Sequence, residues 1–335
     1  MKRLGIGLAM AAWASIAQAD PAPVPVPVPV RVDHHMHVHS PAILAFLPGY
    51  CGSAGRIGKC DPAFTAPLTP DDLLSAMDKA GIRRGLLMST AYLAESPMMV
   101  PERPDHAAIL RAANDWTVAL ALAHPDRFTT FIGVDPITPT ALPEIARWKG
   151  RPGVGGIKLH LTNSGVDLRD AGQRRMLADV FRAGAAAHLP IMIHIRTRAT
   201  DYGAADVRAF IADVLPAAGN DPVQIAHASG WGGIDANTLS ALGAWADAFE
   251  ANPRLGTHVW FDLAEVWKDD TPAADKAKLV ALIRRIGPKH FLAASDWPFA
   301  GDLVAYYGHT YPSLPLSEAE WSIIRRNVAP YARSR

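Results

Sequence analysis

The chain is poor in several features that would assign a function class on their own. It has two cysteines in 335 residues, a formal net charge of +1 and no run of basic residues. Nothing therefore indicates a nucleic-acid partner, which would need clustered positive charge. Beyond the N-terminal segment, no stretch stays apolar for the ~20 residues that cross a bilayer, so we expect no membrane span in the mature protein. A chain of 335 residues with a hydrophobic content of 49% is enough for one large core or two small ones.

The N-terminus has the three parts of a secretory signal peptide. Lys2 and Arg3 supply the charge, an apolar stretch follows, and Ala17-Gln18-Ala19 fits a cleavage site. The apolar stretch is too short to span a bilayer, so we predict a signal peptide over 1–19 and a periplasmic or secreted protein. Residues 20–30 are rich in proline, which lacks the amide hydrogen, and they predict an extended spacer.

From residue 31 to residue 335, short apolar runs alternate with helical patterns. The runs predict buried parallel strands over 31–37, 84–90, 127–135, 153–161, 190–197, 222–227, 257–263 and 290–296. Helices are expected over 69–80, 105–124, 139–148, 169–188, 204–215, 235–250, 273–286 and 317–327. Eight strands, each followed by a helix, predict one α/β domain, a (β/α)₈ TIM barrel. A doubly wound sheet is the alternative, but no Gly-rich phosphate loop follows the first strand.

One connection is much longer than the others. Residues 40–68, between the first strand and the first helix, contain both cysteines. Loops of this length in a compact domain usually cover a functional site or are disordered. In an exported protein, Cys51 and Cys60 are expected to form a disulfide rather than a redox or metal site, with two free thiols as the alternative. Closing so small a loop would stabilise the fold by roughly 2–3 kcal/mol.

Polar residues recur at the ends of five of the eight predicted strands. They are His35 and His37 on the first strand, Lys158 and His160 on the fourth, His194 on the fifth, His227 on the sixth and Asp296 on the eighth. Because the carboxyl ends of barrel strands meet at one face, we expect these side chains to converge there. Two imidazoles at i and i+2 of a strand point to the same side, and imidazole suits zinc and its first-row neighbours.

In this order and at these intervals, the motifs resemble the amidohydrolase superfamily, in particular its amidohydrolase-2 branch. Residues 32–37 resemble the opening motif, an apolar residue and then D-x-H-x-H, and Ser295-Asp296-Trp297-Pro298 resembles the closing S-D-x-P. Ile193-His194 and His227-Ala228-Ser229-Gly230 resemble the histidines of strands five and six, although the latter motif is usually H-x-G-G. The resemblance covers roughly residues 32–300 and implies a metal-dependent enzyme.

The resemblance implies a role for each of these residues. His35, His37 and His194 would bind one divalent metal ion, with zinc as the expected ion. Asp296 would be a further ligand and would take a proton from metal-bound water, whose pKa the ion lowers from 15.7 to about 7. His227 would lie beside the metal and polarise the substrate carbonyl or shuttle a proton.

Two alternatives concern the ligand set. His37 and His39 also form a His-x-His pair, but we prefer His35 and His37 because Asp33 then falls where the motif places it and could orient a ligand histidine. In some superfamily members a strand-four lysine is carbamylated and bridges two metal ions. Lys158 would play that part in a binuclear site, whereas in mononuclear members a basic residue here packs or contacts the substrate. We favour one ion.

Several residues after the strands are candidates for substrate contacts. Arg196 and Arg198 follow strand five and could grip a substrate carboxylate. Trp231, Trp297 and Phe299 follow strands six and eight and could wall a pocket for a flat substrate, although core packing explains them nearly as well.

The preferred hypothesis is an exported, metal-dependent hydrolase of a small ester, lactone or amide. The first alternative is a metal-dependent, non-oxidative decarboxylase of a small unsaturated or aromatic acid, in which Arg196 and Arg198 would bind the carboxylate. The second is a binuclear hydrolase with a carbamylated Lys158, and a non-catalytic metal-binding protein ranks below all three. The expected partner is a small-molecule substrate, and the sequence leaves the oligomeric state open.

Overall fold

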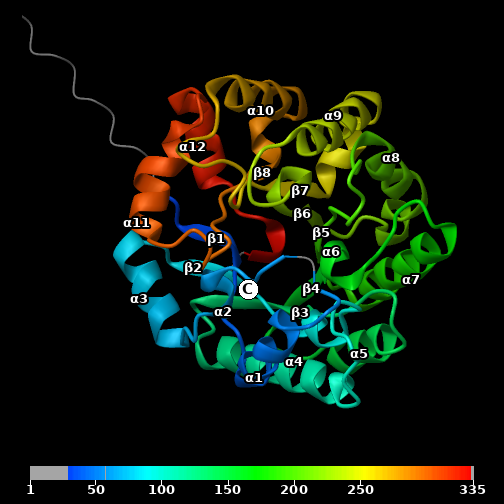
Figure 1. Cartoon of the computed structure of the whole chain (residues 1–335). Helices are drawn as coiled ribbons and strands as arrows, with labels where there is room; N and C mark the ends of the chain where they lie inside the picture. Colours follow the sequence, from blue (N-terminus) through cyan, green and yellow to red (C-terminus); the bar gives the residue numbers. More distant parts are fainter. Residues whose placement is uncertain (1–28, 57, 333–335) are drawn as a thin grey trace, which may run out of the picture.

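Eight parallel strands form the centre of the molecule, and helices surround them (Figure 1). The computed structural model describes residues 29–56 and 58–332. The strands are β1 (Val32–Met36), β2 (Arg84–Met88), β3 (Phe128–Gly133), β4 (Val154–His160), β5 (Ile191–His194), β6 (Val223–Ile225), β7 (Val259–Asp262) and β8 (Phe291–Leu292). Each strand pairs with the next one along the chain. This is the order of a (β/α)₈ barrel.

Backbone hydrogen bonds also join the first strand to the chain after the last one. The amide of Asp296 donates to the carbonyl oxygen of His35 at 2.8 Å, and the amide of His37 donates to that of Trp297 at 2.7 Å. These bonds bring the two edges of the sheet together and confirm the predicted TIM barrel. They also place Asp296 directly beside β1.

The helices lie between the strands, close to their predicted bounds. The longer ones are α3 (Pro70–Ala80), α4 (His106–Ala123), α5 (Ala141–Trp148), α7 (Ala171–Ala187), α8 (Ala204–Asp213), α9 (Ala236–Ala251), α10 (Ala273–Ile286) and α12 (Glu318–Arg326). Short helical segments are α6 (Leu161–Ser164), α11 (Leu303–Ala305), η1 (Ala91–Glu95), η2 (Leu215–Ala218), η3 (Ala226–Ser229), η4 (Pro253–Thr257), η5 (Pro288–His290), η6 (Tyr306–Thr310), η7 (Tyr311–Ser313) and η8 (Pro330–Ala332). Capping boxes at Thr69 and Ser317 begin α3 and α12, so the start of each could be read from the sequence.

The long connection after β1 contains two helices where the sequence pattern indicated a loop. They are α1 (Pro41–Cys51) and α2 (Pro62–Thr65). The hydroxyl of Ser40 accepts the amide hydrogen of Ile43, and proline occupies the first helical position of α1. Buried apolar residues of α1 pack against those of η1. The expected disulfide is present: Cys51, at the end of α1, is bonded to Cys60, just before α2.

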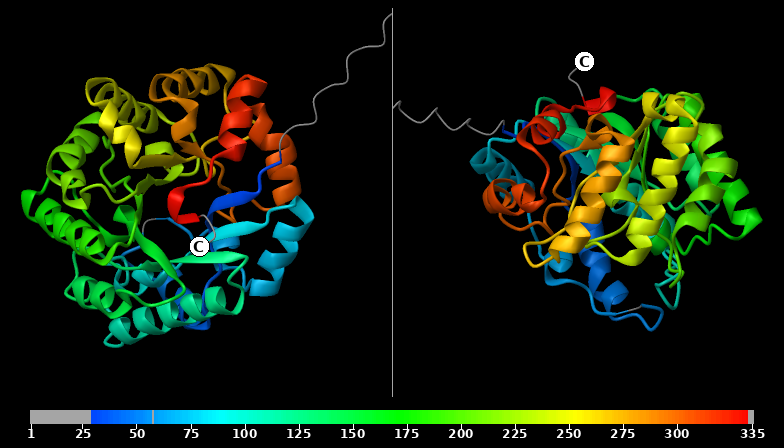
Figure 2. Two further views of the ribbon diagram at one scale, coloured as in Figure 1. Left: turned by 180° about the vertical axis from the view of Figure 1, so that it is seen from behind. Right: turned by 90° about the horizontal axis from the view of Figure 1, so that it is seen from above.

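The C-terminal segment crosses the barrel at the end opposite to this connection (Figure 2). Ala329 and Ala332 are buried inside the barrel, and the ring of Tyr331 packs edge-on against Phe131, with centroids 5.6 Å apart. The amino-terminal end of the barrel is therefore filled by the chain's own residues. The carboxyl end is the one that can hold a ligand.

Within residues 29–56 and 58–332, no helix has the length and apolarity that crossing a membrane requires. The expected signal peptide and most of the spacer fall in residues 1–28, outside the described part of the chain. The division of the chain at residues 19 and 30 stays a prediction.

Candidate active site

A cavity of about 830 Å³ lies at the carboxyl ends of the strands. The residues singled out in the sequence that line it are His35, His37, His39, Lys158, His160, His194, Arg196, Arg198, His227, Trp231, Asp296 and Phe299. The side chains that we expected to converge therefore face one cavity. Trp297 is the exception, because its side chain is buried in the core against Met36 and Leu73 and does not line the cavity. A contact between Trp297 and the substrate is not supported.

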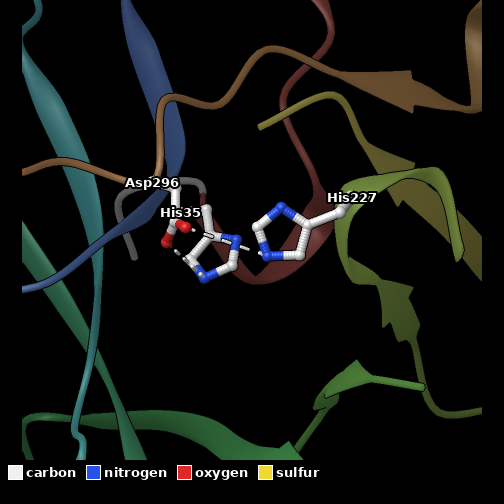
Figure 3. Close-up of side chains that lie close together, drawn as sticks. All are labelled: His35, His227 and Asp296. Carbon is white, nitrogen blue, oxygen red and sulfur yellow. Dashed lines mark ion pairs between the residues drawn. The ribbon is translucent and has the colours of Figure 1, made fainter. Parts of the chain in front are cut away.

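Three histidines and one carboxylate form the centre of this site. His35 Nε2 lies 3.1 Å from His37 Nε2, and Asp296 Oδ1 lies 3.2 Å from each of these nitrogen atoms. His227 Nε2 lies 3.9 Å from Asp296 Oδ2. Figure 3 shows how His35, His227 and Asp296 point toward one another, and their ligand atoms all lie within 4.8 Å. We call these four residues the His–Asp cluster.

Hydrogen bonds on the far side of two rings determine which nitrogen atom faces the cluster. His37 Nδ1 donates to the carbonyl oxygen of Met88 at 3.0 Å, and His227 Nδ1 donates to that of Ala264 at 2.7 Å. A neutral ring that carries its hydrogen on Nδ1 presents the lone pair of Nε2. This is the tautomer that can bind a metal ion through Nε2.

Asp262, the last residue of β7, lies behind the ring of His35, and the sequence analysis misses it. His35 Nδ1 lies 3.3 Å from Asp262 Oδ2, and both side chains are fully buried. The signal was available, because an aspartate near the end of the apolar run 257–263 repeats the pattern of the other strands. A carboxylate behind a ligand histidine fixes the ring and raises its basicity.

Asp33 does not orient a histidine ring, contrary to the expectation from the motif. Its Oδ1 atom accepts hydrogen bonds from the amides of His35 at 3.0 Å and of Ser295 at 3.1 Å. Its Oδ2 atom accepts a hydrogen bond from the hydroxyl of Tyr307 at 2.7 Å. Asp33 therefore ties the backbone of β1 to the segment that carries Asp296.

Two residues of the His–Asp cluster have a backbone conformation that side chains disfavour. The φ angles are 52° at His227 and 59° at Asp296, in the left-handed region. For a residue other than glycine this costs roughly 1–3 kcal/mol and persists only where the surroundings impose it. At His227 the amide donates to Asp262 Oδ1 at 2.9 Å, so the buried carboxylate that lies behind the ring of His35 also holds this backbone.

The protonation states of the site suit metal binding. Burial lowers the pKa of His35 and of His194 well below the ordinary value for histidine. Burial alone would raise the pKa of Asp296, but its contacts with His35 and His37 outweigh burial and hold that pKa below the usual range. Neutral imidazoles and an ionised carboxylate are the forms that coordinate a divalent ion.

The donor atoms also fit a divalent transition-metal ion in kind. Imidazole nitrogen and carboxylate oxygen are the ligands that zinc and its neighbours take, and His35, His37 and Asp296 supply both. His194 stacks on His160 with ring centroids 3.9 Å apart, and its centroid lies 5.2 Å from that of His227. His194 Nδ1 is buried and has no hydrogen-bond partner among the described residues. Its role as a ligand stays a prediction.

The geometry favours His35 and His37 over the alternative pair of His37 and His39. His39 Nδ1 lies 2.8 Å from Thr90 Oγ1, and His39 Nε2 donates to the carbonyl oxygen of Phe64 at 2.8 Å. Both ring nitrogen atoms of His39 are therefore already engaged. His35 and His37 direct their Nε2 atoms toward Asp296.

Lys158 is buried next to the His–Asp cluster. Its Nζ atom lies 3.1 Å from His35 Nε2 and 2.9 Å from the sulfur of Met192. Burial lowers its pKa to about 8, so a fraction of this amine is neutral near pH 7. A neutral amine is the form that carbamylation needs, and an ammonium group is the form that contacts an anion. Both alternatives for Lys158 stay open.

Aromatic rings and cations line much of the cavity beyond the His–Asp cluster, together with the acids Asp61 and Glu265. The rings belong to Phe64, Tyr92, Trp231 and Phe299, and the cations to Arg56, Lys59, Arg196, Arg198 and Lys268. Arg196 is already engaged: its Nη1 atom lies 2.7 Å from Asp235 Oδ2, and its guanidinium group lies over the ring of Trp231 at 4.3 Å. Of the two arginines that were expected to grip a carboxylate, only Arg198 is without an acidic partner among the described residues.

Glu265 is a second residue that sequence reasoning misses. It lines the cavity, has a φ angle of 51° and is 8% exposed. Its carboxylate forms no hydrogen bond or ion pair with the described part of the chain, and burial raises its pKa to about 7, with the charge of Asp296 adding to the effect. No local pattern indicates this, because its backbone is held by Tyr306 and Gly233, which are distant in sequence.

The profile of the amidohydrolase family matches residues 32–309. The chain belongs to the amidohydrolase family, in its amidohydrolase-2 branch. It is an enzyme of the metal-dependent amidohydrolase type, as the motifs predicted. Among curated proteins, a sequence search finds no significant match.

Solved structures of this amidohydrolase fold resemble the chain over nearly its whole length. A 5-carboxyvanillate decarboxylase from Novosphingobium aromaticivorans, with manganese and 4-hydroxy-3-methoxy-5-nitrobenzoic acid, has a TM-score of 0.60 and 15% identity, covering 89% of this chain and 94% of its own. A 2,6-dihydroxybenzoate decarboxylase from Rhizobium has a TM-score of 0.58 and 16% identity, and the match covers 88% of this chain and 96% of the decarboxylase. A zinc-bound amidohydrolase from Burkholderia multivorans has a TM-score of 0.54 and 19% identity, and the match covers 89% of this chain and 96% of that protein. These identities are low, so the likeness is one of fold.

Proposed function

We propose that the protein is a metal-dependent, non-oxidative decarboxylase of a small aromatic or unsaturated acid. The observation that carries this proposal is the His–Asp cluster in a cavity whose outer walls are aromatic rings and cations. Aromatic walls accept a flat ring, and cations attract the carboxylate of an acid. A neutral ester or lactone has no carboxylate, so its binding would not need these cations. The fold that the chain shares with two decarboxylases supports the same choice.

We propose one divalent ion, zinc or manganese, held by His35, His37 and Asp296, with His194 as a further ligand. When bound, such an ion supplies positive charge that holds substrate oxygen atoms and stabilises developing negative charge. Lys158, beside His35, adds a further positive charge at this end of the cavity.

Asp296 and His227 are the groups of this chain placed to move a proton. In decarboxylation the bond between the ring carbon and the carboxyl carbon breaks, carbon dioxide leaves, and a proton is added to the ring carbon. His227 Nε2 faces Asp296 Oδ2 at 3.9 Å, which is too far for a direct hydrogen bond, so a proton would pass between them through one bridging water or a substrate group. The bond from His227 Nδ1 to Ala264 keeps Nε2 pointed toward the reacting group.

The test is a substrate panel with two readouts. Purified wild-type protein is incubated with hydroxybenzoic and unsaturated acids, their methyl esters and small lactones, and carbon dioxide release and hydrolysis are measured separately. We expect carbon dioxide from at least one acid, and a loss of at least about 10²-fold in the Asp296→Asn variant. Carbon dioxide release that is unchanged in this variant would contradict the role given to Asp296.

A metal-dependent hydrolase is the second candidate, because Asp296 Oδ1 lies between two ligand histidines where it could accept a proton from an attacking water. The same panel separates the two functions. Hydrolysis of esters or lactones with no carbon dioxide release from any acid would favour the hydrolase.

We also propose that the protein is exported, as the N-terminal pattern predicts. The disulfide between Cys51 and Cys60 supports this, because disulfides persist mainly in oxidising compartments.

A further inference from the structure

Two guanidinium groups face the outer cavity without an acidic partner. Arg56 lies in the connection after β1, and Arg198 follows β5; both line the cavity. Neither forms an ion pair with the described residues, whereas Arg196, which lies over the ring of Trp231, is paired with Asp235. An unpaired positive charge that is partly withdrawn from water is costly, so its position calls for an explanation beyond the fold.

A hydrogen-bond network holds the two groups close to each other. Arg56 Nη1 donates to the hydroxyl of Tyr50 at 3.1 Å, and that hydroxyl donates to Asn163 Oδ1 at 2.9 Å. Arg198 donates through Nη2 to the carbonyl oxygen of Asn163 at 3.3 Å and through Nε to that of Thr162 at 2.7 Å. Both arginines are therefore anchored at Asn163, one directly and the other through Tyr50.

Each guanidinium group keeps donors for a ligand. Arg198 Nη1 and Arg56 Nη2 have no hydrogen-bond partner among residues 29–56 and 58–332. The Nε atom of Arg56 is also unpaired, but it is fully buried and is not a donor that a ligand can reach. A carboxylate accepts two parallel N–H bonds from one guanidinium group, and two such groups form a strong anion site.

The carboxyl group of Asp135 does not neutralise the positive charge of Arg198. Asp135 is close enough to influence the pKa of Arg198 but forms no ion pair with it, and burial raises the pKa of Asp135 to about 8. This carboxyl group is therefore mainly protonated near pH 7. Burial lowers the pKa of Arg198, Tyr50 and Asp135 raise it, and the nearby charge of Arg56 makes a smaller contribution that lowers it.

The connection after β1 is built to hold its arginine in place. The disulfide joins Cys51 and Cys60 and closes the loop that carries Arg56 and the exposed Lys59, another residue of the cavity wall. The guanidinium group of Arg56 also lies over the ring of Tyr50, 4.9 Å from its centroid. A loop fixed before binding loses less entropy when an anion arrives.

We propose that Arg56 and Arg198 form an anion subsite at the outer end of the cavity, and that it binds a second carboxylate of the substrate. The substrate is then a small, flat dicarboxylic acid, with one carboxylate at the His–Asp cluster and the other at this subsite. The inference rests on the proposed function for the reaction at the cluster, but the subsite stands on its own contacts.

Calorimetric titration of the metal-loaded full chain tests the subsite with two probes, benzene-1,3-dicarboxylate and benzoate. We expect the dicarboxylate to bind at least about tenfold more tightly, because a hydrogen-bonded charge pair is added. Arg56→Gln should abolish this preference and leave benzoate affinity unchanged. Arg198→Gln should do the same, and Arg208→Gln, at an exposed position on α8, should keep the preference.

Arg56→Gln is the deciding variant, because Arg198 also supports two backbone carbonyl groups and its loss could disturb the fold. Equal affinity for the two probes in wild type, or a preference that survives in Arg56→Gln, would overturn the subsite. A protein that releases carbon dioxide from monocarboxylic acids but shows no preference would lose the subsite and keep the proposed function. One that prefers the dicarboxylate but releases carbon dioxide from no acid would lose the proposed function and keep the subsite.

Discussion

His35 Nδ1 and Asp262 Oδ2 lie 3.3 Å apart at one end of a buried polar chain that runs along the barrel. Gln224 Nε2 donates to Asp262 Oδ2 at 2.7 Å, and the hydroxyl of Tyr331 donates to Gln224 Oε1 at 2.6 Å. These contacts connect the His–Asp cluster at the open end of the barrel with the C-terminal segment. Figure 2 shows this segment at the closed end. We expect the position of His35, a candidate metal ligand, to depend on these residues.

Replacement of Asp262 by Asn should weaken metal binding. The side chain keeps its size but loses the charge that orients His35, and changes behind a ligand histidine typically cost about 10–100-fold in metal affinity. The measurement is the rate at which a chelator removes the bound ion. Asp270→Asn, at an exposed position, serves as the matched control and should release its ion at the wild-type rate.

Tyr331→Phe tests the same chain of contacts from its far end. It removes only the hydroxyl group that holds Gln224, so we expect a smaller acceleration of metal release, of a few-fold, with the fold intact. If Asp262→Asn and Tyr331→Phe both retain metal as the wild type does, the orientation of His35 does not depend on this chain.

The sequence predicts the strands and most of the cluster because each strand is an apolar run that ends in a polar residue. It predicts α3 and α12 because their capping residues are local. The same local signal, Ser40 followed by Pro41, marks the start of α1, although the length of residues 40–68 predicted a loop there. Asp262 also ends an apolar run, so the same pattern would have predicted it as a site residue.

Other features depend on contacts between distant parts of the chain. Asp33 turned to the backbone because Ser295 and Tyr307 supply donors there, more than 250 residues away in sequence. Arg196 pairs with Asp235 and leaves only Arg198 free of an acid, which spacing along the chain does not show. These partners are determined by how distant segments pack, and the local pattern of a single sequence does not indicate that packing.

Lys158 decides between one metal ion and two. We expect one ion per chain in the purified wild type and the same content in Lys158→Met, a variant that keeps the volume of the buried side chain. The reason is that Lys158 contacts His35 as an amine and supplies no ligand oxygen in that form. Elemental analysis by mass spectrometry gives the count. Two ions in wild type, falling in the variant, would make the carbamylated, binuclear site correct.

Glu265 should make stability depend on pH. Its pKa is raised from 4.5 to about 7, so the folded protein holds this proton more tightly than the unfolded chain. The favourable contribution is complete below pH 4.5, falls as the pH rises and is lost above about pH 7. Glu265→Gln does not titrate. With allowance for solvent screening, we expect it to be more stable than wild type by about 1–2 kcal/mol at pH 8 and similar at pH 5.

The measurement is urea unfolding of the chelator-treated protein at both pH values, with the disulfide intact. Chelation matters because a bound ion would add its own charge beside Asp296, which influences Glu265. The exposed Asp270→Asn variant should show no such gain at pH 8. A Glu265→Gln protein that is equally or less stable than wild type at pH 8 would mean that water solvates this carboxylate in the cavity.

Removal of the disulfide should affect both stability and recognition. The bridge closes a loop with a sequence separation of 9, and restricting that loop in the unfolded chain is worth about 2–3 kcal/mol. The double variant Cys51→Ser, Cys60→Ser should lose this much in urea unfolding, and wild type treated with a reductant should match it. Because the loop carries Arg56, the variant should also bind benzene-1,3-dicarboxylate more weakly while benzoate binding is kept. A loss of stability without a loss of this preference would show that α1 and Tyr50 position Arg56 without the bridge.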